Sequence, residues 1–198
     1  MRMGLGRAFM DGMCLRNGMG IQSIAVLGAG QMGNGIAQVA ACAGYDVTMI
    51  DINQDYLDNG MVAVKNSLSR VVKKERMTQD EADFAIAKIS TSTDKNAASS
   101  ADLVIEAIPE IPELKFSTFS ELDEICKPDA ILASNTSSIS INAIAKATNR
   151  PERVIGMHFM NPVPVMKLVE IINGSATSSE VTQFVLDACD KMGKIPLS

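Results

Sequence analysis

Three glycines with the spacing of a phosphate-binding loop directly follow a short apolar run at residues 24–27. The run predicts a buried strand, and the loop after it reads Gly28, Ala29, Gly30, Gln31, Met32 and Gly33. In such a loop the first glycine permits a tight turn, the second lets the backbone approach a pyrophosphate, and the third lets the helix pack closely on the strand. Free amide groups at the positive end of that helix then face the phosphates. The pattern predicts a dinucleotide site.

An acidic residue stands where such a site meets the ribose. Asp51 directly follows the second predicted strand, residues 47–50. Its carboxylate can accept hydrogen bonds from both ribose hydroxyls and repels a 2′-phosphate, which favours NAD over NADP. The alternative is a structural turn beside a surface acid. Strand, loop, helix and acid all stand in the expected order, and this favours the dinucleotide site.

His158 is the single histidine of the chain, and it lies near the end of a predicted strand at residues 154–159. Open α/β sheets place their ligands at this edge. The polar run 134–138 ends the preceding strand at the same edge, and Glu170 lies in the following strand, within reach of an imidazole nitrogen. Histidine oriented by a carboxylate is a common acid–base pair. By position alone, this catalytic role and a structural role are equally open. In the structural alternative, Glu170 pairs with Lys167 and the polar run caps a helix.

The elements that must position these residues alternate between short apolar runs and helical patterns. Strands are predicted at 24–27, 47–50, 89–91, 103–107, 131–134, 154–159 and 168–172. Helices are predicted at 33–43, 113–126, 139–147 and 179–192, with a long amphipathic one around 57–71 and another opening at the Thr78–Glu81 capping box. This alternation is typical of a Rossmann-type, doubly wound α/β fold with a mostly parallel sheet.

Composition excludes several other classes of protein. The formal net charge is −5, and the densest basic cluster is only Lys73, Lys74 and Arg76, so we expect no nucleic-acid partner. The four cysteines are far apart and lack metal-ligand spacing, which indicates a reduced intracellular protein without a metal site. No apolar run reaches the roughly 18 residues of a membrane span, so we expect no membrane association.

The two ends of the chain differ from its middle. Residues 1–19 are rich in methionine, glycine and arginine, and we interpret them as a leader, either disordered or upstream of a translation start at Met19. Residues 20–198 are expected to form one NAD-binding domain. Residues 194–198 look like the start of a further strand, so we expect a chain that was cut or lacks a second domain.

Three segments resemble the L-3-hydroxyacyl-CoA dehydrogenase family, including its 3-hydroxybutyryl-CoA branch. They are the glycine loop 28–33, the polar segment 133–138 (Ala-Ser-Asn-Thr-Ser-Ser) and the long segment 156–170 from Gly156 to Glu170. The resemblance covers residues 20–198. It implies an NAD-dependent oxidoreductase that interconverts (S)-3-hydroxyacyl-CoA, here 3-hydroxybutyryl-CoA, and 3-oxoacyl-CoA.

The resemblance also implies roles for individual residues. His158 is implied as the acid/base at the 3-hydroxyl, Glu170 as the group that orients it, Ser137 as a donor to the substrate oxygen, and Asn161 as a neighbour of the nicotinamide and the histidine. Further positions match family residues near the cofactor (Glu110, Lys115) and near coenzyme A (Ser67, Lys74); Lys74 has the alternative of a solvated helix residue.

This sequence departs from the family in three ways. Pro109 and Pro112 flank Glu110, where the family has residues better suited to a helix, and Met160 replaces an aromatic residue. The family's all-helical C-terminal domain, which brings an active-site asparagine, much of the acyl pocket and the dimer interface, is missing from this sequence. We therefore expect a homodimer only where that domain is supplied, and a cytoplasmic protein, with a mitochondrial location left open by residues 1–19.

Two kinds of function stay under consideration. The first is the dehydrogenase itself, in a truncated form of low activity. The second is a non-catalytic NAD-binding module or structural protein derived from the same fold. His158, Ser137 and Glu170 together favour the first, whereas the absent helical domain favours the second. Sugar-acid dehydrogenases, which share the glycine loop, use a lysine for catalysis and leave the His158 segment without a role.

Overall fold

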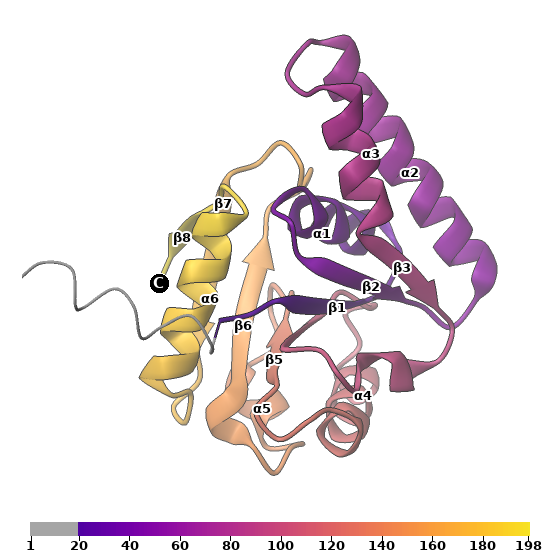
Figure 1. Ribbon diagram of the computed structural model, residues 1–198. Coiled ribbons are helices and arrows are strands. Elements are labelled where there is room, and N and C mark those ends of the chain that lie inside the picture. Colours follow the sequence, from indigo (N-terminus) through magenta and orange to yellow (C-terminus); the bar gives the residue numbers. More distant parts are fainter. Residues whose placement is uncertain (1–19) are drawn as a thin grey trace, which may run out of the picture.

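One sheet of eight strands forms the centre of the molecule (Figure 1). The computed structural model describes residues 20–198, so the predicted leader and the start at Met19 lie outside the described residues. In spatial order the strands are β3 (Ile89–Ser92), β2 (Asp46–Ile50), β1 (Ser23–Leu27), β4 (Leu103–Glu106), β5 (Ile131–Ser134), β6 (Val154–Phe159), β7 (Leu168–Asn173) and β8 (Ile195–Leu197). The first six follow the order 3-2-1-4-5-6, which is the Rossmann arrangement.

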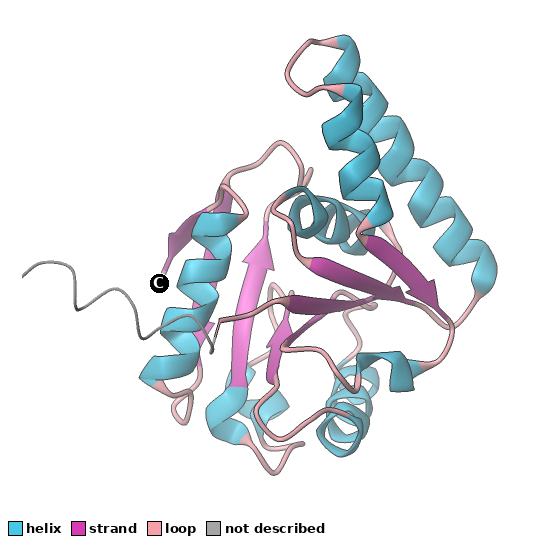
Figure 2. Cartoon of the chain, viewed as in Figure 1, coloured by secondary structure: helices cyan, strands magenta, loops and turns pink. Residues whose placement is uncertain are grey.

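Helices cover both faces of this sheet, with irregular segments between them (Figure 2). One face packs against α1 (Gln31–Cys42), α2 (Gln54–Lys73), α3 (Gln79–Ala87) and α6 (Ser179–Lys191). The other packs against α4 (Pro112–Ile125), α5 (Ile141–Ala145) and the short 3₁₀ helix η1 (Lys95–Ala98). A second 3₁₀ turn, η2 (Pro151–Arg153), leads into β6. The predicted doubly wound α/β fold is confirmed.

Small residues let α1 lie close against the sheet. Gly33, Ala37, Ala40 and Ala41 are buried in this helix. A Cβ atom at Gly33 would lie 1.8 Å from the carbonyl oxygen of Gly28, so only glycine fits there. Gly28 itself has a φ of 99°, which other residues rarely adopt. The two glycines thus serve the turn and the close packing that the sequence pattern assigned to them.

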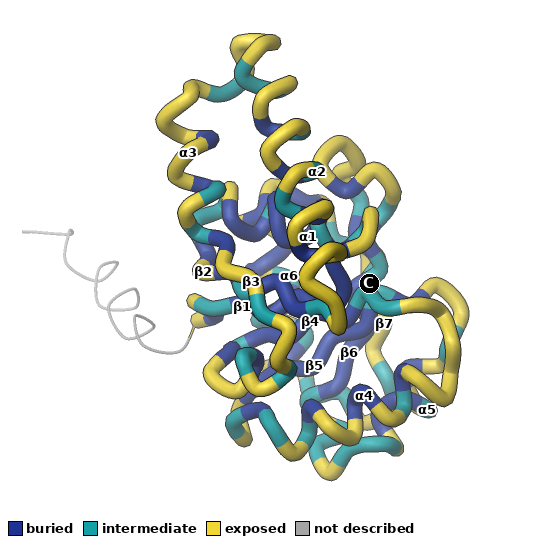
Figure 3. The backbone as a smooth tube through the Cα atoms, turned by 90° about the vertical axis from the view of Figure 1, so that its right-hand side faces the viewer, coloured by how far each residue is buried: buried dark blue, intermediate teal, exposed yellow. Residues whose placement is uncertain are grey.

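The hairpin of α2 and α3 projects beyond the sheet, and its outer surface is exposed (Figures 1 and 3). The spacing of Leu57, Met61, Val64, Leu68 and Val71 predicts one apolar face of α2; Leu57, Val64 and Leu68 are buried there, whereas Met61 and Val71 are only partly buried. Thr78 and Glu81 form the predicted capping box of α3. Among residues 20–198, no helix is both long and apolar enough to cross a membrane.

Strands β7 and β8 are the exceptions to the parallel sheet: β7 runs antiparallel to β6, and β8 pairs in parallel with β7, so both run opposite to the other six strands. The expected strand after residue 194 is therefore present. Helix α5 is shorter than the predicted helix at 139–147, because the Thr136 hydroxyl accepts hydrogen bonds from the amides of Ser138 and Ile139 and holds those residues in a turn. This turn lies beside His158, at the edge of the sheet considered next.

Candidate functional site

A large cavity lies where the strand order reverses, between the carboxyl ends of β1 and β4. Ligands of open α/β sheets bind at this point. The cavity measures about 730 Å³. Its lining includes the predicted cofactor residues Gly28, Ala29, Gly30, Gln31, Met32 and Asp51. The third glycine, Gly33, is buried beneath the turn and does not line the cavity.

The residues of this cavity fit a dinucleotide. A Cβ atom added to Gly30 meets nothing within 4 Å, so open space stands directly over the backbone where a pyrophosphate must approach. Gly30 is also the N-cap of α1, and no side chain caps the amides of its first turn. Those amides stay available to an anion.

Asp51 is held at the rim of the cavity by two backbone amides. Its Oδ2 accepts from the amide of Ala29 at 2.7 Å, and its Oδ1 accepts from the amide of Ile52 at 2.7 Å. A carboxylate has about four acceptor positions, so room for ribose hydroxyls is left. The carboxylate thus fixes the glycine loop to the end of β2 at the rim of the cavity.

A second cavity of about 310 Å³ lies next to the first along the same edge. It brings together residues from three separate segments that the sequence analysis singled out: Glu110 and Lys115, Ser137, and His158 with Asn161. Met32 of the glycine loop and Ala107 and Ile108 after β4 line both cavities. A molecule that extends from one cavity into the other therefore passes from the glycine loop to His158.

His158 and Glu170 face each other across the antiparallel pair of β6 and β7. The register places them directly opposite, and Nδ1 of His158 lies 2.8 Å from Oε2 of Glu170. The imidazole is about one quarter exposed. Among residues 20–198 its Nε2 has no hydrogen-bond partner, and Glu170 forms no ion pair with Lys167, the alternative considered above. The pair leaves one ring nitrogen free for a ligand.

Two asparagines hold the segment around His158. Asn161 accepts a hydrogen bond from Nε2 of Gln31 at 3.2 Å, which ties it to the glycine loop. Oδ1 of Asn135 accepts from the amide of Phe159 at 2.8 Å, which ties the end of β6 to the turn after β5. Ser137 lies in that turn and lines the second cavity.

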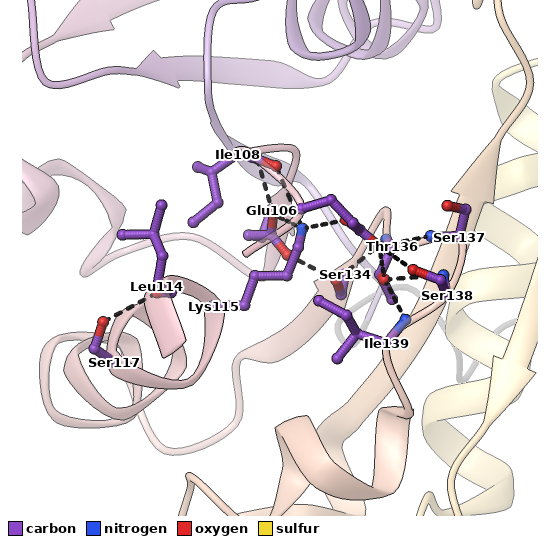
Figure 4. A network of polar contacts seen from close by, with 11 residues as sticks. Glu106, Ile108, Leu114, Lys115, Ser117, Ser134, Thr136, Ser137, Ser138 and Ile139 are labelled. Carbon is purple, nitrogen blue, oxygen red and sulfur yellow. Dashed lines mark hydrogen bonds and ion pairs between the residues drawn. The ribbon is translucent and has the colours of Figure 1, made fainter. Parts of the chain in front are cut away.

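A buried ion pair underlies this turn. Nζ of Lys115 lies 2.6 Å from Oε1 of Glu106 and 3.1 Å from Oε2 of Glu110, and the side chains of Lys115 and Glu106 are 1% and 0% exposed. Figure 4 shows Lys115 and Glu106 pointing toward each other from α4 and the end of β4. The other carboxylate oxygen of Glu106 accepts from the Ser134 hydroxyl at 2.6 Å. The network joins β4, α4 and β5 directly below the site.

Glu110 extends the network to the cavity. It accepts hydrogen bonds from the Thr136 hydroxyl, the Ser137 amide and the Ser138 hydroxyl. Burial acts to raise the pKa of Glu110, but hydrogen bonds from Thr136 and Lys115 outweigh it and hold this pKa below its ordinary value. Pro112 is the first residue of α4, a favoured place for proline, so the helix starts after Glu110 and leaves it in the turn.

Ser67 and Lys74 are not part of either cavity. They lie on α2 and at its C-cap, while Tyr56 and Asn59 of the same helix line the first cavity. At 1.5 Å per residue, Ser67 is about 12 Å further along the helix than Asn59 and Lys74 about 22 Å further. The structure therefore separates these two residues from the other predicted site residues.

Sequence reasoning missed Glu106 and Asn135 as site residues. The signal for Glu106 was its place at the end of the otherwise apolar strand β4, with Lys115 nine positions later on a helix. Such a charge is buried only when it is paired. Among residues 20–198, no group of three or more histidine, cysteine or acidic side chains could hold a metal ion.

Comparisons with known proteins agree with this geometry. The family model described as "3-hydroxyacyl-CoA dehydrogenase, NAD binding domain" matches residues 23–198. A Bacillus subtilis (strain 168) protein named "Probable 3-hydroxybutyryl-CoA dehydrogenase" is 53% identical over 176 residues, which are 89% of this chain and 61% of that protein. The mitochondrial hydroxyacyl-coenzyme A dehydrogenase of Rattus norvegicus is 41% identical, over 90% of this chain and 59% of the relative.

A solved structure of a similarly named dehydrogenase also resembles this chain. The (S)-3-hydroxybutyryl-CoA dehydrogenase of Ralstonia eutropha superposes with a TM-score of 0.88 at 44% identity, over 89% of this chain and 62% of that one. The chain thus spans about 60% of the length of these relatives. With the glycine loop, Asp51 and the strand order in agreement, this chain belongs to the 3-hydroxyacyl-CoA dehydrogenase family, and residues 23–198 are its NAD-binding domain.

Proposed function

We propose that this protein catalyses the NAD-dependent interconversion of a short (S)-3-hydroxyacyl-CoA, 3-hydroxybutyryl-CoA, and the 3-oxoacyl-CoA. One observation carries the proposal: the His158–Glu170 pair at 2.8 Å lies in the cavity next to the glycine loop. The names of the relatives support the dehydrogenase class and an acyl-CoA substrate.

His158 is proposed as the acid/base. Oxidation of the alcohol breaks the O–H and C3–H bonds, and Nε2 of His158 takes the hydroxyl proton while the C3=O double bond forms. A bound NAD would supply the acceptor for the hydride that leaves C3. In the reverse direction His158 returns the proton to the oxygen. An imidazole is suited to both tasks because it titrates near neutral pH.

Glu170 is proposed to orient His158 and to stabilise its charge. Its hydrogen bond at Nδ1 fixes the ring and leaves Nε2 for the substrate, and its carboxylate balances the imidazolium that forms when the proton arrives. Antiparallel pairing holds both residues on rigid strands, which limits the reorganisation that the reaction needs.

Ser137 and Asn161 are proposed to position the reactants. Both line the cavity with His158, Ser137 as a donor to the substrate oxygen and Asn161 beside the nicotinamide. Glu110 and Lys115, from the same cavity, are proposed to act near the cofactor, and the glycine loop with Asp51 to hold its phosphates and ribose. Ser67 and Lys74 on the α2 surface are proposed contacts for the coenzyme A portion.

The test is acetoacetyl-CoA-dependent oxidation of NADH by the purified protein, followed at the nicotinamide absorbance band. Turnover supports the dehydrogenase. The alternative is a non-catalytic NAD-binding module or structural protein derived from the same fold. NADH binding without turnover identifies that module, and tighter binding of NADPH than of NADH contradicts the assignment of the cofactor site.

Replacement of Asp51 tests the ribose contact. In Asp51→Ala we expect NADH to bind about ten- to a hundredfold more weakly, since hydrogen bonds to a charged group contribute about 1.5–3 kcal/mol. Inorganic pyrophosphate, which has no ribose, should lose less affinity. Asp51→Asn keeps an oxygen that can accept from the Ala29 amide but removes the negative charge, so it separates support of the loop from the effect of the charge. In this variant the affinity for NADPH should rise relative to the affinity for NADH. Calorimetric titration of the three ligands checks both variants, and an equal loss for pyrophosphate and NADH assigns Asp51 to loop structure alone.

A further inference from the structure

A buried lysine outside the predicted site reaches into the connection between β6 and β7. Lys194 lies directly before β8 and is only 7% exposed. Its Nζ donates to the carbonyl oxygen of Val163 at 2.5 Å and to that of Met166 at 2.8 Å. Within residues 20–198 it has no carboxylate at ion-pair distance, so backbone oxygens are its ligands.

Those two carbonyls belong to one tight turn. The amides of Val165 and Met166 both donate to the carbonyl oxygen of Pro162, at 3.0 and 2.9 Å. The turn leaves the carbonyls of Val163 and Met166 for Lys194. Burial lowers the pKa of Lys194, because the ammonium is costly to desolvate. A buried ammonium of this kind is retained only where several oxygens ligate it.

The same turn carries Asn161 at its start and lies against the nucleotide-binding helix. Asn161 accepts from Gln31, and Val163 packs on Gly35 of α1, where an added Cβ would come within 2.9 Å of the valine Cβ. The segment is therefore held on one side by α1 and on the other by Lys194. Its far end is fixed as well, because the amide of Ile195 donates to the carbonyl oxygen of Lys167 at 2.8 Å.

We propose that Lys194 is a positioning residue: by ligating the carbonyls of Val163 and Met166 it holds the 161–167 segment so that Asn161 stays in the cavity with His158. This proposal rests on the proposed function only for what Asn161 does there. It predicts that replacing Lys194 affects the binding of the two halves of the cofactor differently. The adenosine half, at Asp51 and the glycine loop, does not depend on Lys194, whereas the nicotinamide half, beside Asn161, does.

Lys194→Met tests the clamp by removing the ammonium while keeping an unbranched side chain of similar length. Lys167→Met is the matched control, because Lys167 is an exposed lysine of the same segment. Hydrogen exchange of the Val165 and Met166 amides reports the order of the turn directly. We expect exchange at least about tenfold faster in Lys194→Met and unchanged in Lys167→Met. Unchanged exchange in both variants overturns the clamp.

Binding of NADH and of ADP-ribose then tests the positioning role. Lys194→Met should bind NADH about tenfold more weakly and ADP-ribose within about twofold of the unaltered protein, because ADP-ribose lacks the nicotinamide. Lys194→Arg keeps a cation and should recover part of the NADH affinity. Equal losses for both ligands overturn the positioning role and make Lys194 a purely structural residue.

Two further outcomes are separable. If Lys194→Met does not fold, Lys194→Gln, which keeps an amide donor without charge, provides the same comparison. If the unaltered protein binds neither ligand, the proposed function is wrong, while the exchange rates of Val165 and Met166 still decide whether Lys194 orders the turn.

Discussion

His158→Gln is expected to lower turnover of acetoacetyl-CoA by roughly 10²–10⁴-fold, the usual contribution of a general acid or base. Glutamine keeps polarity and approximate size but cannot exchange a proton at neutral pH. The glycine loop and Asp51 are untouched, so NADH affinity should change only a few-fold. Steady-state kinetics with acetoacetyl-CoA, together with an NADH titration, separate the two effects.

Glu170→Gln is the companion variant. Its amide can still hydrogen-bond Nδ1 of His158, but it carries no charge to balance the imidazolium, so a smaller loss of turnover than in His158→Gln is expected. Full activity in His158→Gln removes this residue from the mechanism. A parallel loss of NADH affinity instead shows that the substitution has disturbed the cavity shared with Asn161.

The parts that could be predicted from the sequence are those coded by local pattern. Glycine spacing, the apolar run before it and the acid after β2 lie within about 30 residues of one another, and each has a local physical reason. The same holds for the stripe of α2 and the capping box of α3. The opposition of His158 and Glu170 could be anticipated as proximity, because both lie on consecutive strands.

The parts that could not be predicted depend on pairs far apart in the sequence. Glu106 meets Ser134 because β4 and β5 are neighbours in register, and nothing within either strand marks this contact. Lys194 reaches Val163 across 31 residues, through a turn whose shape depends on both of its ends. The sequence shows the polar residues at the strand ends, but the order of the strands in the sheet decides which residue each of them contacts.

The Glu106–Lys115 pair shows why such partners matter for stability. Both side chains are essentially unexposed, and each would be a strongly unfavourable buried charge without the other. Neighbouring groups add to the pair: Ile108 donates its amide to Glu106 at 2.8 Å, and Ser134 donates its hydroxyl. Lys115 also lies near Glu110, which is 37% exposed and therefore partly screened by water. The pair thus supports the turn that carries Ser137, at the edge of the second cavity.

Lys115→Met is accordingly expected to lower the free energy of unfolding by about 3–5 kcal/mol, because Glu106 is left as an uncompensated buried carboxylate. Urea denaturation of the variant measures this loss. Lys88→Met is the control: Lys88 pairs with Asp46 at 2.7 Å, but both side chains are partly exposed, and a loss of only about 0.2–1 kcal/mol is expected. The double variant Glu106→Gln/Lys115→Met removes both charges and should be more stable than Lys115→Met alone. The contrary outcome is that the losses of stability in Glu106→Gln and Lys115→Met, each measured alone, add up in the double variant. In that case the ion pair is not what holds β4 to α4, and the support of the Ser137 turn must come from the Ser134 and Thr136 hydroxyls.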